Sequence, residues 1–441
     1  MTATISKPAE STAHIPITSK PTTGILTEAQ WVERWGIALT DDPQAFAELP
    51  REAYDELPAY NYSFLKTIWS YCPFKAWLEF RDPNRPARER KEHFLHGDLH
   101  HCHLLEPEKY ESRYAIAPEN APKRPTEAQL AKLIDVDMDS LGIIPSDMPK
   151  RPTQKQVEAL KPKSETSTTY EKWLDVQERA QRWAEWEAQN PGKKPVTAEE
   201  SAELASISYA AKFWSQFDAE NAGKELISTK DAEFGAALAN SVLSHPRFSS
   251  LFANTPENRR GNELTLSYIH PWLGVRIKAR IDALRLLASP YLRLWVGDLK
   301  GTKDARPGAQ GFGKEVANFG YLMQAAFYHD AVVFCRAPIE RILQLSDGAL
   351  DMVPVEFEFV ASEKAIPRHE FVSGHTISEA THPREMSLGR QAASAALTEA
   401  VWCDSSGHWP GYDVAAQPLE VPEWVLRQME ARLAVLGEEG L

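Results

Sequence analysis

Two neighbouring segments of the chain carry two carboxylates and an amine that could act together. Residues 274–284 alternate apolar and polar side chains with a period of two, which is typical of a β-strand and places Asp282 on the polar face. Residues 292–302 read as a second apolar strand, in which Asp298 and Lys300 are two residues apart and point the same way. If the two strands pair, Asp282 meets Asp298, with Lys300 beside them.

Carboxylates and an amine in one place suit the metal-assisted hydrolysis of a phosphodiester. Oxygen ligands hold a hard cation such as Mg²⁺, usually through one or two carboxylates with waters completing the shell. The cation lowers the pKa of a bound water and offsets negative charge on the phosphorane. Lys300 could orient or deprotonate that water, or stabilise the developing charge. The alternative is a solvated hairpin with a salt bridge, because Asp-x-Lys alone is a common pattern.

Three cations share the polar face of the first segment with Asp282. They are Arg276, Lys278 and Arg280, which alternate with the apolar residues. Such a row could bind DNA phosphates, or it could only solubilise an exposed face. The formal net charge of −13 disfavours a broadly basic surface but allows a local basic groove.

Further candidate residues lie on two segments that read as helices. Gln324 and Tyr328 are four residues apart, so an amide and a phenol project from one helix face. His101 belongs to a second helical run, where His96 and His100 have the spacing of a zinc pair. No Glu completes a His-Glu-x-x-His arrangement there and no cysteine pair completes a site, which disfavours zinc.

Taken in order, these motifs resemble the RecB-like branch of the PD-(D/E)XK nucleases. Within that branch the chain is similar to the RecE family, exodeoxyribonuclease VIII. The similarity runs roughly from Tyr60 to Trp424, with an insertion after Pro118. Its other matching pieces are YNYSFLKTIWSYCP (60–73), Gly97-x-x-x-His101, LLEPEKY (104–110), FVASEKAIP (359–367) and HWPGY (408–412).

The resemblance implies a role for each residue at the two strands. His101, Asp282 and Asp298 match the metal ligands of the family. The backbone carbonyl of Leu299 matches a further metal donor, and Lys300 matches the catalytic lysine.

The remaining positions match the pattern of the family to different degrees. Gln324 and Tyr328 match a Gln-x-x-x-Tyr motif that lies beside the scissile phosphate in the family. Glu263 resembles an acidic position of the family through a looser match. Gly297 before Asp298, and Asp298 itself as second acid, depart from the family name, although both variants occur within it.

The activity implied by the resemblance is that of a Mg²⁺-dependent exodeoxyribonuclease, in which Mn²⁺ can substitute. RecE-like enzymes, often encoded on prophages, degrade linear duplex DNA 5′ to 3′ and leave 3′ single-stranded tails for a RecT-like annealing protein in DNA recombination and repair. They form homo-oligomeric rings, and a ring could reconcile an acidic chain with a basic lumen. Two alternatives stay open: a Cas4-like or structure-specific single-strand nuclease, and a non-catalytic DNA-binding module on the same fold.

Composition bears on compartment and cofactors. The 441 residues contain no run of about 18 apolar residues, so no membrane span is expected. The cysteines Cys72, Cys102, Cys335 and Cys403 are widely spaced, which disfavours a disulfide framework and suits a reducing cytoplasm. Only Cys335 and Cys403 follow the Gln-x-x-x-Tyr motif, too far apart for the clustered cysteines of an iron–sulfur site, so no iron–sulfur cluster is expected.

The order of the expected elements predicts an α/β fold, a restriction-endonuclease-like PD-(D/E)XK core with a mixed central sheet flanked by helices. We expect helices over 27–40, 94–105, 169–189, 229–243, 320–334 and 386–401, and further strands over 339–345 and 353–360. The predicted domains are a disordered tail (1–26), the N-terminal helical part of the nuclease domain (27–118), a Pro- and Lys-rich helical insertion (119–200), the nuclease core (201–425) and a C-terminal helix (426–441).

Overall fold

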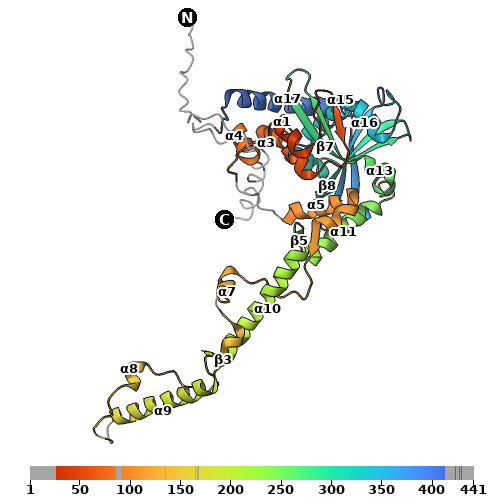
Figure 1. Cartoon of the computed structure of the whole chain (residues 1–441). Coiled ribbons are helices and arrows are strands. Elements are labelled where there is room, and N and C mark those ends of the chain that lie inside the picture. The colour runs from red at the N-terminus through yellow and green to blue at the C-terminus, as the bar shows by residue number, and fades with distance from the viewer. Residues whose placement is uncertain are drawn as a thin grey trace, which may run out of the picture. The chain divides into compact units, whose positions relative to one another are not determined.

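A computed structural model describes residues 26–85, 92–134, 136–163, 165, 168–412, 423, 427 and 429. The chain divides into two compact units: Met1–Lys109 with Glu233–Leu441 form unit 1, and Tyr110–Ala232 form unit 2 (Figure 1). The predicted N-terminal tail and C-terminal helix lie almost entirely outside the described residues and stay predictions. Within the described residues, no helix is long and apolar enough to cross a membrane.

Unit 1 is built on a six-stranded mixed sheet in the order β1-β6-β7-β8-β9-β10. Only the β8–β9 pair is parallel, and the other neighbours are antiparallel. The strands are β1 (Gln44–Phe46), β6 (Asn262–Ile269), β7 (Arg276–Leu287), β8 (Arg293–Thr302), β9 (Val355–Glu363) and β10 (Val372–Ile377). The predicted mixed sheet is therefore confirmed.

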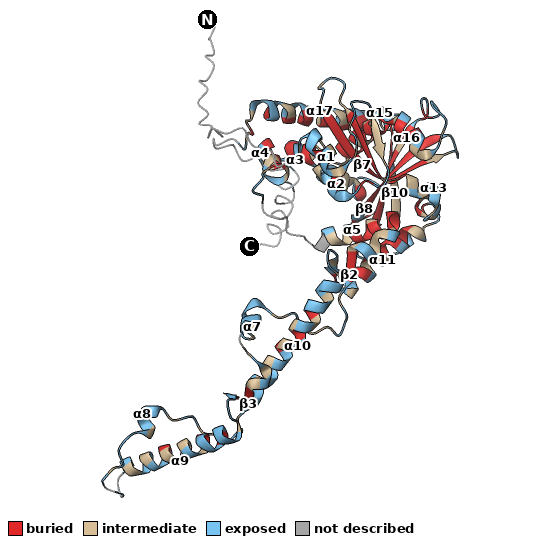
Figure 2. Cartoon of the chain, in the orientation of Figure 1, coloured by how far each residue is buried: buried red, intermediate tan, exposed pale blue. Residues whose placement is uncertain are grey.

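Helices cover both faces of this sheet, and the strands between them are buried (Figure 2). The larger core joins the sheet to α3 (Tyr62–Ser70), α4 (Pro73–Phe80), α14 (Phe312–Phe319), α15 (Tyr321–Phe334), α16 (Arg336–Leu343) and α17 (Pro383–Ser406). The core on the opposite face joins it to α5 (Glu92–Leu105), α11 (Thr229–Leu243) and α12 (Ser249–Phe252). A third, smaller core joins α1 (Glu28–Trp35) to α2 (Arg51–Glu56), and α13 (Pro256–Arg260) precedes β6.

Unit 2 combines long and short helices with two small parallel strand pairs. Strand β2 (Tyr114–Ile116) pairs with β5 (Glu225–Ile227), and β3 (Leu141–Ile143) pairs with β4 (Lys194–Val196). The helices include the short α6 (Tyr110–Arg113), α7 (Glu127–Ala131) and α8 (Gln154–Val157) and the long α9 (Thr168–Gln189) and α10 (Ala198–Glu220). Helix α10 begins where Thr197 and Glu200 form a capping box, which satisfies two backbone donors of its first turn.

The sheet opens into a fork between β7 and β8. Strand β7 pairs with β6 from Arg276 to Ala283, but its pairing with β8 ends at the Ala283–Gly297 pair. Beyond that pair β8 continues beside β9 alone, up to the Thr302–Glu363 pair. Asp282 and Asp298 are therefore the first residues on the two arms of the fork, as the predicted strand pairing required.

The backbone of Tyr60 occupies part of the β7 edge that β8 leaves open. The Tyr60 amide donates to the carbonyl of Arg276 at 2.9 Å, and the Lys278 amide donates to the carbonyl of Tyr60 at 2.9 Å. Two backbone groups of β7 thus find partners although β8 has departed, and the chain runs on directly into α3.

Two expectations about elements are wrong. Residues 339–345 were expected as a strand, but Ile339 lies inside α16, whose apolar side is buried; a short apolar run does not distinguish strand from buried helix. The helix expected over 27–40 ends at Trp35, because Gly36 adopts a left-handed conformation that closes α1. The other six expected elements are confirmed within a few residues.

Candidate metal centre

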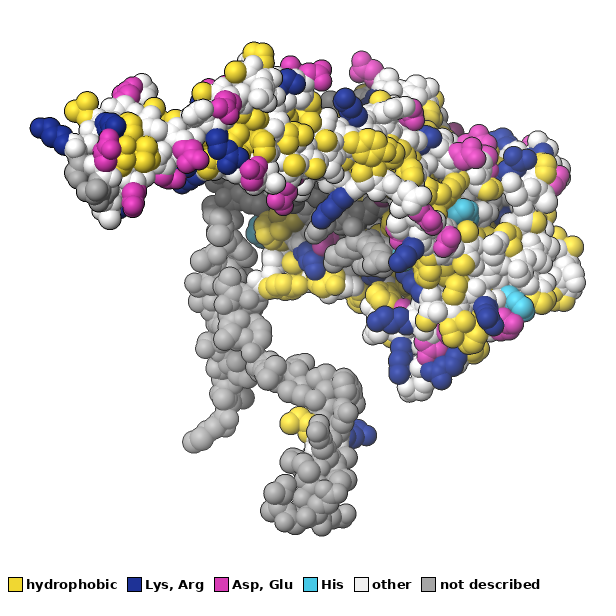
Figure 3. All heavy atoms as spheres, turned by 90° about the horizontal axis from the view of Figure 1, so that it is seen from below, with side chains coloured by type: hydrophobic (Ala, Val, Ile, Leu, Met, Phe, Trp, Pro, Cys, Tyr) yellow, Lys and Arg dark blue, Asp and Glu magenta, His cyan; other side chains and the backbone are white. Residues whose placement is uncertain are grey.

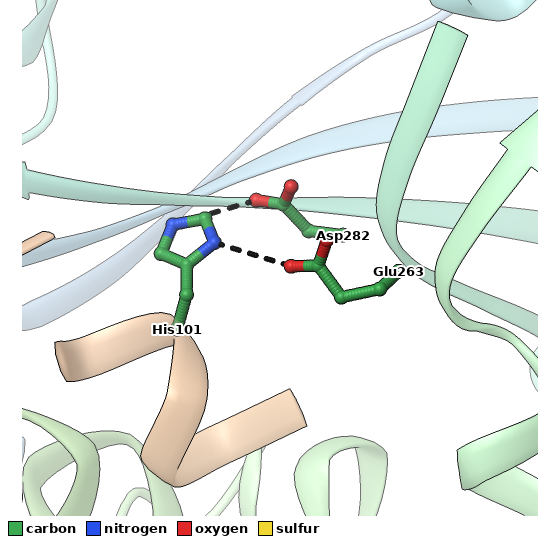
Figure 4. A group of neighbouring side chains, drawn as sticks. All are labelled: His101, Glu263 and Asp282. Atoms are coloured by element: carbon green, nitrogen blue, oxygen red, sulfur yellow. Dashed lines mark ion pairs between the residues drawn. The ribbon is translucent and has the colours of Figure 1, made fainter. Parts of the chain in front are cut away.

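Three side chains from three elements converge at the base of the fork. His101 projects from α5, Glu263 from β6 and Asp282 from β7 (Figure 4). His101 Nδ1 lies 3.6 Å from Glu263 Oε1, and His101 Nε2 lies 3.8 Å from Asp282 Oδ2. One ligand atom from each of the three residues lies within 4.8 Å of the other two, which is a spacing that one cation could bridge.

The pairing of β6 with β7 brings the two acids together, and the backbone of Glu263 is irregular at this point. The flanking pairs Asn262–Ala283 and Leu264–Ile281 place Glu263 opposite Asp282. Glu263 has a φ of +48°, a left-handed conformation that residues other than glycine rarely adopt. Residues opposite each other in a strand pair share a face of the sheet, so Glu263 and Asp282 lie on one side of it and both approach His101.

Asp298 and Lys300 form the second half of the site, on β8. The Lys300 ammonium makes an ion pair with Asp298, whose other carboxylate oxygen accepts a hydrogen bond from Gln324 Nε2 at 2.7 Å. Asp298 is 2% exposed, so its charge is held inside the protein by these contacts. Asp298 therefore lies beside the group of three ligands, with its carboxylate engaged by Lys300 and Gln324.

The backbone of Leu299 also faces the fork. Its amide donates a hydrogen bond of 2.8 Å to Asp282 Oδ2, across the gap between β8 and β7. In a strand, the N–H and C=O of one residue point to the same side. The Leu299 carbonyl is thus directed toward Asp282 as well, in keeping with its predicted role as a metal donor.

The acids of the site have opposed pKa shifts. Burial raises the pKa of Asp282 to about 7; His101 opposes this rise, and the charges of Asp298 and Glu263 add to it. Burial would also raise the pKa of Glu263, but hydrogen bonds and charges from His101 and Arg280 lower it to about 2. Glu263 is thus an ionised acceptor. Of these two carboxylates, Asp282 is the one whose burial is offset less by neighbouring positive groups.

The two adjacent histidines of α5 differ in the same way. Burial would lower the pKa of His101, but Asp282 and Glu263 raise it to about 9. Burial lowers the pKa of His100 to about 3, and the charges of His101 and Lys364 reinforce the effect. Only His101 of this pair has acidic partners, which agrees with its choice as the ligand.

Gln324 and Tyr328 lie along one side of α15, close to the acids. Gln324 binds Asp298 directly, and burial raises the pKa of Tyr328 well above its ordinary value, helped by Asp298 and Asp282. The Tyr328 ring meets the edge of the Tyr62 ring at a centroid distance of 6.2 Å. The structure thus brings all the predicted catalytic and metal-binding residues to one place, and their roles stay predictions.

The residues present fit a divalent cation. Two carboxylates, one imidazole and a backbone carbonyl are donors that magnesium and manganese accept. Burial raises the pKa of Asp282 and the charges of Asp298 and Glu263 add to that rise, so a bound cation would stabilise the ionised carboxylate. Glu263, whose sequence match was loose, has a more central place in this group than the sequence indicated, because Asp298 is engaged by Lys300.

The three cations expected on an exposed face of β7 are buried, so that expectation is wrong. Arg276, Lys278 and Arg280 are 4%, 4% and 7% exposed. Arg276 pairs with Glu28, and Arg280 pairs with Glu263, each at 2.6 Å. The Lys278 ammonium donates to three backbone carbonyls at the end of α2, and burial lowers its pKa to about 7. Cations with these partners are not available to DNA phosphates.

Comparisons with known proteins give little guidance. No protein-family model and no curated protein matches the chain. A crystal structure from Eubacterium rectale, described as a "putative exonuclease", covers 87% of this chain and 98% of its own, at 10% identity and a TM-score of 0.34. A likeness this weak carries no argument, so the functional assignment rests on the site.

Proposed function

We propose that this protein is a magnesium-dependent nuclease of the PD-(D/E)XK type. The observation that carries the proposal is the fork, where His101, Glu263 and Asp282 come within ligand distance of one another beside the Asp298–Lys300 pair. This combination suits the hydrolysis of phosphodiesters, because acids hold a cation while a lysine supplies positive charge next to it.

The residues of the site divide the chemistry between them. A bound divalent cation supplies Lewis-acid activation of the phosphodiester and of the attacking water. Burial would lower the pKa of Lys300, but Asp298, Tyr321 and Asp282 raise it above its ordinary value. We therefore assign Lys300 the role of an ammonium that offsets charge on the phosphorane, and not that of a base. Gln324 holds Asp298 in place for this pairing.

The finer proposal follows the RecE resemblance. The substrate is the end of linear duplex DNA, the attacked strand is the one with the 5′ terminus, and the product is a 3′ single strand. The proposal further includes a RecT-like annealing partner, a homo-oligomeric ring and a cytoplasmic location. A ring loads only at an end, so it would spare closed circles.

Labelled DNA tests both levels of the proposal. With Mg²⁺, the protein should release a 5′ label early from linear duplex, retain the 3′ label on long single strands, and leave closed circles intact. EDTA and Asp298→Ala should each stop cleavage. Early loss of the 3′ label would overturn the polarity, and cutting of circles or single strands alone would favour the Cas4-like alternative. Full activity in Asp298→Ala would refute the site.

A further inference from the structure

DNA binding at this site needs cations that the three buried residues of β7 do not supply. The net charge of the chain is −13. On the face drawn in Figure 3, acidic and basic side chains are interspersed over the described surface. The phosphates must therefore be held by individual cations close to the fork.

Lys66 lies on the α15 side of the fork. Its ammonium is 5.5 Å from the centroid of the Phe319 ring and 6.0 Å from that of Tyr62. Phe319 stacks on Tyr321 at 5.7 Å, and the Lys300 ammonium lies 5.0 Å from the Tyr321 centroid. The neighbouring rings of Phe319 and Tyr321 thus lie close to the ammonium groups of Lys66 and Lys300, respectively.

Lys364 lies on the opposite side of the same strand end. Its stem crosses Gly301 so closely that a Cβ on this glycine would come within 2.4 Å of Lys364 Cε. Residues 300 and 301 point to opposite faces of β8, so Lys364 and Lys66 lie on different sides of it. The charge of Lys364 also acts on His100, which is next to the ligand His101.

Both lysines are half-buried, and neither makes an ion pair within the described part of the chain. Burial lowers the pKa of Lys66, with a contribution from the charge of Lys300, and burial lowers the pKa of Lys364. Lys66 is thus held near the ammonium of Lys300 with no ion-paired acid of its own, and Lys364 is partly buried with only the charge of Glu315 to offset that burial, so both arrangements cost free energy. Phosphates of a bound strand would remove that cost.

We propose that Lys66 and Lys364 bind the DNA phosphates on either side of the scissile phosphodiester, with Lys300 between them. The inference rests on the proposed nuclease function and adds the residues that hold its substrate. Both lysines contact phosphates and no bases, so the grip is independent of sequence. A side chain at Gly301 would meet the stem of Lys364 and force it to move.

Salt dependence of DNA binding measures these contacts directly. The full-length protein is titrated into labelled linear duplex in EDTA, at several KCl concentrations, and binding is followed by fluorescence anisotropy. Lys66→Gln and Lys364→Gln should each reduce the slope of log K against log [KCl] by about 1, and the double variant by about 2. Lys66→Arg should restore the slope, because it keeps the charge.

A matched control is Lys75→Gln, which changes a half-buried lysine of α4 whose ammonium lies 3.3 Å from the centroid of the Tyr71 ring. It should leave the slope unchanged, and circular dichroism should show all variants folded. Unaltered slopes in Lys66→Gln and Lys364→Gln, or no salt-dependent binding by the wild-type protein, would overturn the inference. Cleavage by the wild-type protein in Mg²⁺ is scored separately, so the two proposals can fail independently.

Discussion

At the scale of the residue, Glu263 is the most informative position of the site. Its left-handed backbone costs on the order of 1 kcal/mol or more, and such strain persists where the surroundings fix it. Here the surroundings are specific: Arg280 binds one carboxylate oxygen at 2.6 Å, while the other faces His101. A carboxylate with a strained backbone, one oxygen bound by an arginine and the other directed at a histidine is the arrangement expected of a metal ligand.

Glu263→Gln should weaken metal binding while the protein stays folded. The substitution keeps the size of the side chain and removes the negative charge, so the affinity for Mn²⁺ should fall by about tenfold to a hundredfold. Isothermal titration calorimetry of the metal-free protein measures this. The control is Glu356→Gln, which removes an acid of β9 paired with Arg293 outside the metal group. Equal losses in both variants would mean that general charge, and not ligation, is responsible.

The sequence predicted the members of the site better than their arrangement. Asp282, Asp298 and Lys300 could be placed together from strand periodicity alone, and the fork does place them so. The central position of Glu263 could not be predicted, because it depends on the pairing of β6 with β7 and on the approach of α5, which only the fold brings together.

At the scale of the element, β7 shows why alternation can mislead. Its polar positions alternate as on a solvent-facing strand, yet both faces are buried, because α1, α2 and β6 supply acids and carbonyls to its cations. Those partners lie more than 200 residues away for Arg276 and Lys278, so no local pattern reveals them. Burial of a cation depends on its partners, which only the fold brings together.

Lys278→Met should destabilise the fold without a direct effect on DNA contacts. The ammonium donates to the carbonyls of Tyr54, Asp55 and Leu57, and the methionine would leave these acceptors without it. The free energy of unfolding should fall by about 3 kcal/mol, measured by urea denaturation. The exposed Lys314→Met should change it little. A folded Lys278→Met with a reduced salt slope for DNA would instead revive the phosphate-binding hypothesis for β7.

The contact between α15 and α17 should make stability dependent on pH. Burial would raise the pKa of Asp330, but hydrogen bonds from His329 and from the bidentate Arg390 lower it below its ordinary value. A depressed carboxyl pKa stabilises the fold above the unfolded pKa, and this contribution is lost as the pH falls through the folded value.

Asp330→Asn should therefore lower the free energy of unfolding by about 1 kcal/mol at pH 6, since the pair is partly exposed. The difference from wild type should shrink below about pH 4, where the unfolded carboxyl is protonated. Thermal unfolding at several pH values gives the comparison, with Asp55→Asn of an exposed ion pair as control. A difference that stays constant down to pH 2 would contradict the assignment.

At the scale of the whole molecule, the predicted insertion and the compact unit have different bounds. The insertion was predicted over 119–200 from its proline and lysine content, whereas unit 2 spans Tyr110–Ala232. The difference consists mainly of β2, most of α10 and β5, and the ordinary helical composition of α10 gives no sign of a boundary. The residues of the candidate site all belong to unit 1.

Unit 2 should be removable without loss of the metal centre. Strands β2 and β5 lie side by side, and the Ala117 amide donates to the carbonyl of Ile227, so the chain leaves and returns at one place. Replacing residues 118–224 with a short Gly/Ser linker should leave Mn²⁺ affinity unchanged and the unfolding midpoint within about 4 °C. Calorimetry and thermal unfolding test this, and a deletion protein that folds but binds no metal would show that unit 2 supports the site.

The backbone of Tyr60 has a consequence for self-association. A strand that loses its neighbour presents free amides and carbonyls, which another chain can extend by adding a strand. Tyr60 of the same chain already bonds to the Arg276 carbonyl and the Lys278 amide. A second chain therefore cannot add a strand along this stretch of β7. The protein can therefore keep the fork open for chemistry without exposing this edge as a template for aggregation.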